Sequence, residues 1–147
     1  MSNIQNNVLR YEAAADLVTG DIVKLDTNGK AAKVAAAEAT DAIGIVVEST
    51  DSGKSAPIIT SGIIDVRVLV EDTDSGAGYD AAIARGAHLL ISGKASGTYP
   101  VGQALSASTG TGVTTADATT LVAKALEAVA GSTAADTYTT IKAKVQF

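Results

Sequence analysis

The chain has 147 residues, which fits a single domain, and 46% of them are hydrophobic while only 3% are aromatic. Its 11 basic and 16 acidic residues give a net charge of -5, and the scattered basic residues argue against nucleic-acid binding. With no cysteine, the chain forms neither disulfides nor thiolate metal sites. The polar start does not resemble a signal peptide, and no apolar run reaches the roughly 18 residues of a membrane-spanning helix. We therefore expect a protein made in a cytoplasm, with no membrane partner.

The N-terminal residues are polar and show no periodicity, so residues 1–10 are expected to form a flexible arm. The remaining residues, 11–147, are expected to form one β domain. Residues 8–11 can begin its first strand, because they are apolar and bulky apart from Arg10.

The clearest strand pattern runs through residues 18–68, where short runs rich in Val and Ile alternate with turn-forming residues. Residues 21–25 and 30–34 are expected to form a hairpin, because Asn28-Gly29 between them tolerates positive φ. Residues 43–47 form a continuous apolar run that predicts a central strand buried on both faces. Gly44 within this run predicts either a close approach of another backbone or a β-bulge. Residues 57–60 and 63–70 are expected to form two further strands.

The second half begins with residues 71–80, an acidic, glycine-rich stretch that we interpret as a linker. Beyond it we expect a helical turn at 81–85, strands at 87–91 and 103–106, a loop at 92–102 and a turn at 108–112. Residues 121–130 have helical propensity, with Thr120 as an N-cap and Gly131 as a stop, yet a strand is the alternative we favour.

An internal repeat over residues 17–70 and 81–147 supports that choice. Residues 83–90 resemble 17–24, residues 119–127 resemble 40–48, and residues 141–145 resemble 64–68, in the same order. If the two copies share a fold, 121–130 corresponds to the strand at 43–47. The sequence therefore predicts a mainly β protein of two related units, forming a small sandwich or barrel with at most short helices.

The motifs that could carry chemistry are incomplete. His88 has no nucleophile motif beside it, and both Gly53-Lys54-Ser55 and Ser92-Gly93-Lys94 lack the first glycine of a phosphate-binding loop. Residues 72–80 begin like a calcium loop, but the twelfth position is Ile83 instead of Glu. Lys142 and Lys144 lie on one face of a strand, where they either protect a sheet edge or contact an acidic partner.

Four segments together resemble the β module of tailed-bacteriophage capsid decoration proteins, also called cement proteins. The segments are Gly20-Asp21-Ile22-Val23, Asn28-Gly29-Lys30, Ile43-Gly44-Ile45-Val46-Val47-Glu48 and Gly62-Ile63-Ile64-Asp65-Val66-Arg67-Val68. The likeness is good over residues 18–68 and looser over 81–145.

The resemblance implies a non-enzymatic protein with no catalytic residue, cofactor or metal. It would bind the major capsid protein on the outer surface of a phage head as a homotrimer and stabilise the shell against internal pressure. The N-terminal arms of such proteins order on the capsid by strand addition. The implied capsid-contact residues are Ser2, Asn3, Ile4, Gln5, Asn6, Asn7, Val8, Leu9 and Arg10.

Two other classes stay open. One is a structural or adhesive β module of a virion fibre or cell surface, with residues 72–80 binding calcium or glycan. The other is an enzyme on a β scaffold. Calcium-dependent thermal stability would favour the first, and hydrolytic activity that is lost on mutating a clustered Asp or His would favour the second.

Overall fold

The computed structural model describes residues 6–35, 41–70, 83–91, 103–107, 121–130 and 137–147. Its elements in these ranges are the strands β1 (Asn7–Glu12), β2 (Ile22–Leu25), β3 (Ala31–Lys33), β4 (Ala42–Val46), β5 (Ser55–Val70), β6 (His88–Ile91), β7 (Leu105–Ala107), β8 (Leu121–Ala125) and β9 (Thr137–Gln146). The predicted fold class is confirmed, because the chain is mainly β and its sheet is curled like a small barrel. Within the described ranges, no helix is long and apolar enough to cross a membrane.

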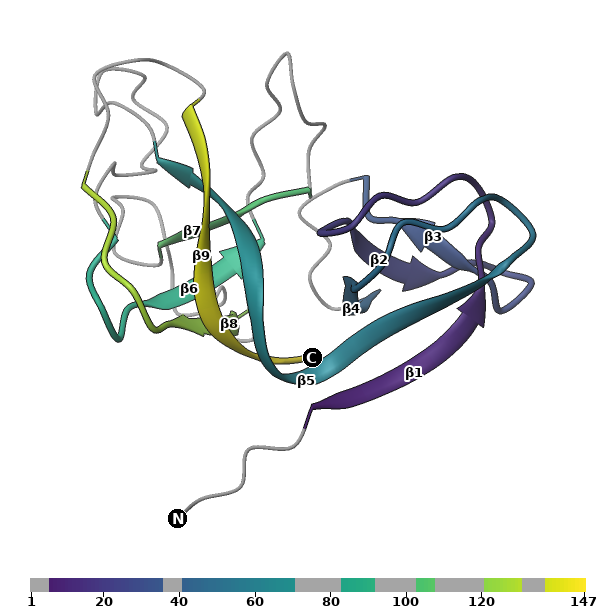
Figure 1. Cartoon of the computed structure of the whole chain (residues 1–147), viewed down its shortest axis with the longest axis horizontal. Coiled ribbons are helices and arrows are strands. Elements are labelled where there is room, and N and C mark those ends of the chain that lie inside the picture. The colour runs from purple at the N-terminus through teal and green to yellow at the C-terminus, as the bar shows by residue number, and fades with distance from the viewer. Residues whose placement is uncertain (1–5, 36–40, 71–82, 92–102, 108–120, 131–136) are drawn as a thin grey trace.

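Strand pairing arranges the chain in two small rings that share β5 (Figure 1). In the first unit, β1, β5, β4, β2 and β3 follow one another, and a parallel bridge between Ala13 and Ala31 returns from β1 to β3. In the second unit, β5, β9, β8, β6 and β7 follow one another, and the parallel pair Val68–Leu105 returns to β5. Each unit is therefore a ring of five strands that closes through one parallel residue pair.

The two units repeat each other's backbone contacts. The contacts that recur are Leu17–Thr50 with Ile83–Val129, Gly20–Val46 with Gly86–Ala125, and Ala13–Ala31 with Val68–Leu105. The irregularities recur too: the register shift between Val23 and Lys24 is matched by one between Leu89 and Leu90. The same sheet geometry is thus built twice from different side chains.

The structure agrees with two of the three expected sequence correspondences and corrects the third. The recurring backbone hydrogen bonds of the two units align residue 17 with 83 and residue 46 with 125, as the sequence pattern predicted. The match of residues 141–145 with 64–68 is wrong: β9 pairs with β8 as the first half of β5 pairs with β4, so residues 141–145 correspond to 56–60. The second unit therefore begins within β5, near Gly62, whereas the expected linker at 71–80 lies outside the described residues.

Three local expectations also change. Residues 57–60 and 63–70 form one continuous strand, because β1 pairs with its first half and β9 takes over at Ser61. Residues 7–10, expected in a flexible arm, belong to β1. In place of a helical turn at 81–85, Ile83 forms a bridge with Val129, and residues 81 and 82 lie outside the described ranges. For residues 121–125 the strand is confirmed, and the loop at 92–102 and the turn at 108–112 are not among the described residues.

Each ring encloses equivalent apolar residues. The interior of the first unit contains Ala13, Leu17, Val23, Ala31, Val46, Ala56 and Ile58. Their counterparts in the second unit belong to a larger cluster: Val68, Ile83, Leu89, Leu105, Ala125, Ile141 and Ala143. That larger cluster also contains Ile22, Val34, Ile45 and Ile59 of the first unit. The outer face of the first unit is thus buried in a core shared with the second.

β4 is buried on both of its faces. Ile45 belongs to the shared core and Val46 to the interior of the first unit, so the predicted burial on both faces is confirmed. The close approach at Gly44 is confirmed as well, since a Cβ there would lie 2.6 Å from Cγ2 of Ile58 and closer still to the carbonyl oxygen of Ile59.

Candidate functional site

The start of β1 is tied to the middle of β5 by the side chain of Asn6. Its Oδ1 accepts a hydrogen bond from the backbone N–H of Ile63 at 3.0 Å, and its Nδ2 donates to the Ile63 carbonyl at 3.4 Å. Gly62 leaves room for this contact, because a Cβ there would lie 2.8 Å from Cγ of Asn6. Gly62 also has a φ of 131°, which other residues rarely adopt. The direction in which β1 enters the fold is therefore set by this contact.

β1 is the most exposed strand of the first unit. Val8 and Leu9 are 45% and 49% exposed, although their partners on β5, Ile59 and Ile58, are buried. Among the described residues, β1 pairs only with β5 between Asn7 and Glu12. The edge of β1 that faces away from β5 therefore has no strand partner in the described part of the chain. β1 thus combines an open edge with two half-exposed apolar side chains.

These observations locate the expected capsid-contact residues. Ser2, Asn3, Ile4 and Gln5 lie outside the described residues, while Asn6 anchors the strand. Asn7, Val8, Leu9 and Arg10 all lie on β1 and are exposed. The described part of the predicted segment is therefore an ordered edge strand.

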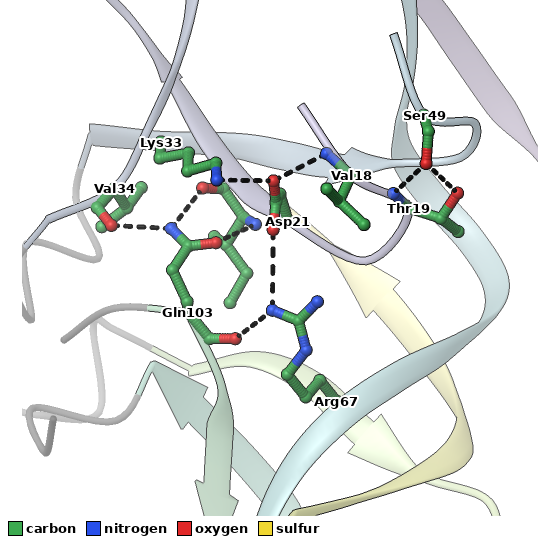
Figure 2. Close-up of polar contacts among 9 residues, drawn as sticks. Val18, Thr19, Asp21, Lys33, Val34, Ser49, Arg67 and Gln103 are labelled. Carbon is green, nitrogen blue, oxygen red and sulfur yellow. Dashed lines mark hydrogen bonds and ion pairs between the residues drawn. The ribbon is translucent and has the colours of Figure 1, made fainter. Parts of the chain in front are cut away.

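A second polar site lies between the units, where Gln103 inserts its side chain into the first unit (Figure 2). Its Oε1 accepts a hydrogen bond from the backbone N–H of Ile22 at 2.9 Å. Its Nε2 donates to the carbonyl of Ile22 at 2.9 Å and to that of Val34 at 2.6 Å. Only 1% of Gln103 is exposed, so its amide acts as an internal partner for the ends of β2 and β3.

Asp21 and Arg67 continue this junction (Figure 2). Asp21 Oδ2 accepts from the backbone N–H of Val18 at 2.8 Å and lies 3.4 Å from Lys33 Nζ. Its Oδ1 lies 3.6 Å from Arg67 Nη1, which also donates to the carbonyl of Gln103 at 2.9 Å. The buried carboxylate thus has a cation from each unit.

The junction is suited to holding the units together, because every polar atom named above already has a partner within the chain. The sequence contains a weak sign of it: Asp21 follows Gly20 and bonds back to Val18, as short acidic residues at turns often do. No local sign marks Gln103 or Arg67, whose partners lie 81 and 36 residues away along the chain. Sequence reasoning missed both residues for that reason.

The motif residues that the structure describes, His88 and Gly53-Lys54-Ser55, do not form an enzymatic or nucleotide-binding site with each other. His88 is exposed and lies opposite Lys124. The backbone N–H groups of Gly53 and Lys54, which a phosphate would need, donate instead to the carbonyls of Ala13 and Asp51. No cluster of three metal-binding side chains occurs in the described ranges, and residues 72–80 and 92–94 lie outside them.

β9 changes the interpretation of Lys142 and Lys144. Because β9 pairs with β5 on one side and β8 on the other, it is not a sheet edge, and the expectation that these lysines protect an edge is wrong. Lys142 instead forms an ion pair with Asp65, at 3.1 Å. Lys144 has no carboxylate partner among the described residues, and its expected contact with an acidic partner stays a prediction.

The chain matches no protein-family model, and no curated protein is significantly similar to it.

Proposed function

We propose that this protein is a non-enzymatic capsid decoration protein that binds the outer surface of a phage head as a homotrimer and stabilises the shell. The observation that carries the proposal is β1, with its open backbone edge and its exposed Val8 and Leu9. The likeness of residues 18–68 to such proteins adds to it, as does a fold whose buried polar groups serve its own cohesion.

The binding step would be strand addition along β1. A segment of the major capsid protein would pair with the open edge, gaining main-chain hydrogen bonds, while Val8 and Leu9 lose their contact with water. Burying the exposed halves of these two side chains would contribute about 2 kcal/mol in total, or roughly 30-fold in affinity. Many copies on one shell would make this modest affinity sufficient.

The test uses purified undecorated, expanded heads mixed with the protein at increasing concentration, with occupancy counted by cryo-electron microscopy. The double variant Val8→Thr/Leu9→Gln should keep its fold, shown by an unchanged circular dichroism spectrum, and should need about 30-fold more protein for half occupancy. Leu25→Gln is the matched control, since Leu25 is also an exposed apolar residue but lies on β2. Heads that remain bare at every concentration of the unmodified protein would reject the proposed function.

Deleting residues 1–5 separates the arm from the strand. Asn6 and β1 remain in this variant, so the fold should persist, and any loss of binding would belong to the arm itself. A truncated protein that saturates heads at the same concentration as the full chain would show that β1 alone makes the contact.

A further inference from the structure

The outer face of the second unit carries a row of three basic side chains. His88 is paired with Lys124 across β6 and β8, and Lys124 is paired with Lys144 across β8 and β9. All three residues are exposed, and directly paired residues project from the same face of a sheet. Like charges placed directly opposite each other destabilise a sheet, so the fold itself does not benefit from this basic row.

The carboxylates that the structure describes near the basic row are engaged with Lys142. Asp65 pairs with Lys142 at 3.1 Å, and Glu127 accepts a hydrogen bond from the backbone N–H of the same residue at 2.9 Å. Of the ion pairs formed among the described residues, none includes Lys124 or Lys144. Within the described part of the chain, the row is therefore a basic surface with no ion-pair partner at Lys124 or Lys144, on a chain whose net charge is -5.

The repeat shows that this position is an interface in the other unit. The residues of the first unit that correspond to His88, Lys124 and Lys144 are Ile22, Ile45 and Ile59. Those three isoleucines are buried in the core that the two units share. The face that joins the units within one chain is thus exposed in the second unit, where it carries two lysines and a histidine.

A surface of opposite charge lies on the first unit. The bridge between Leu17 and Thr50 places Asp16 beside Asp51, and Glu48 lies two residues before Thr50. All three acidic residues are exposed, and none forms an ion pair within the described part of the chain. Val18 and Val47, 54% and 38% exposed, adjoin these acidic residues in sequence, as expected of a contact surface. We call these five residues the acidic end.

We propose that the basic row of one copy docks on the acidic end of a second copy, head to tail. Such a contact joins two different surfaces, so successive copies close into a ring if the rotation allows. The inference rests on the proposed function in one respect: it takes the homotrimer from that proposal and assigns the surfaces through which the copies would contact each other. Nucleic acid is a poorer occupant, because a chain of net charge -5 repels it.

The test is a pair of charge reversals read by sedimentation velocity in low salt. Lys124→Glu/Lys144→Glu should weaken self-association about tenfold or more. Lys24→Glu/Lys30→Glu changes the net charge equally, but Lys24 lies on β2 and Lys30 immediately precedes β3, outside both surfaces, so this variant should leave association unchanged. Asp16→Lys/Asp51→Lys should weaken association as the first variant does, and each variant's circular dichroism spectrum should match that of the unmodified protein.

Mixing the two reversed variants makes the test specific. Each alone presents like charges to its own copies, whereas the mixture again pairs an acidic row with a basic end and should recover association. About 1 M salt, where the Debye length is roughly 3 Å, should dissociate the unmodified protein. A mixture that stays monomeric, or reversed variants that associate normally, would overturn the inference. A monomeric unmodified protein that still decorates heads would overturn it as well; of the proposed function, that result would keep the binding to heads and remove the homotrimer.

Discussion

Replacing Gln103 by Met tests whether one buried amide joins the two units. Methionine keeps a similar volume but offers no hydrogen bond, so the N–H of Ile22 and the carbonyl of Val34 lose their partner. The Ile22 carbonyl keeps its bond from the backbone N–H of Val34 at 2.9 Å. Two orphaned buried groups at about 1–3 kcal/mol each predict a loss of roughly 2–6 kcal/mol. That is a large part of the roughly 5–15 kcal/mol that stabilises a typical domain.

The measurement is urea denaturation combined with hydrogen exchange. The free energy of unfolding should fall by the stated amount, and the amide of Ile22 should lose its protection against exchange. Gln146→Met is the matched control, because Gln146 is exposed and its change should stay within about 0.5 kcal/mol. A loss below about 1 kcal/mol with Ile22 still protected would refute the reasoning, since Gln103 would then be replaceable by a rearranged backbone or by water.

Three further predictions concern single contacts. Gly44→Ala should destabilise the protein by about 2–3 kcal/mol, because the added Cβ would overlap Ile58 and the backbone of Ile59. The comparison variant Gly53→Ala should cost only about 1–2 kcal/mol, because Gly53 has a φ of 83° but no atom within 4 Å of the added Cβ. Equal thermal midpoints for the two variants would contradict this prediction. Asp21→Asn keeps an acceptor for Val18 but removes the charge that Arg67 and Lys33 face, so we expect a loss of about 2–3 kcal/mol that 0.5 M salt does not reproduce in the unmodified protein. Glu12 raises the pKa of Lys30 above 10.5, first by accepting its hydrogen bond and then by its charge, so Glu12→Gln should lower that pKa in an NMR titration. Because the folded pKa of Lys30 is raised, the pair's contribution to stability is present below pH 10.5 and disappears as the pH rises through the folded value.

Local features of the fold could be predicted where a few neighbouring residues decide them. Asn28-Gly29 forms the expected turn, in which Gly29 has a φ of 73° and the β2–β3 hairpin follows. The strand preference of residues 121–125 emerged only from comparing them with 43–47, since their own propensity is helical. The match of residues 141–145 failed because these residues and 64–68 both alternate between apolar and charged side chains, so a pattern of period 2 aligns the two segments although their strand pairings differ.

The candidate sites differ in the same way: one is formed by residues close in the sequence, and the others by residues far apart. β1 was within reach of sequence reasoning because its exposed Val8 and Leu9 follow a polar start, although its pairing with β5 was not expected. The junction of Gln103 with Ile22 and Val34 was out of reach, because its hydrogen bonds join residues 81 and 69 positions apart. The basic row also needs three strands side by side before His88, Lys124 and Lys144 become neighbours.

The sequence alone determined that this chain forms many short strands from small apolar residues, and that similar strand segments occur in both halves of the chain. These features could be predicted because turn-forming residues and the alternation of side chains depend on only a few neighbouring positions. Only the tertiary structure decided where one unit passes into the next, and which of two equivalent faces is buried. The physical reason is that a strand's partners are set by packing between distant segments, so Ile22, Ile45 and Ile59 are covered while His88, Lys124 and Lys144 face outward.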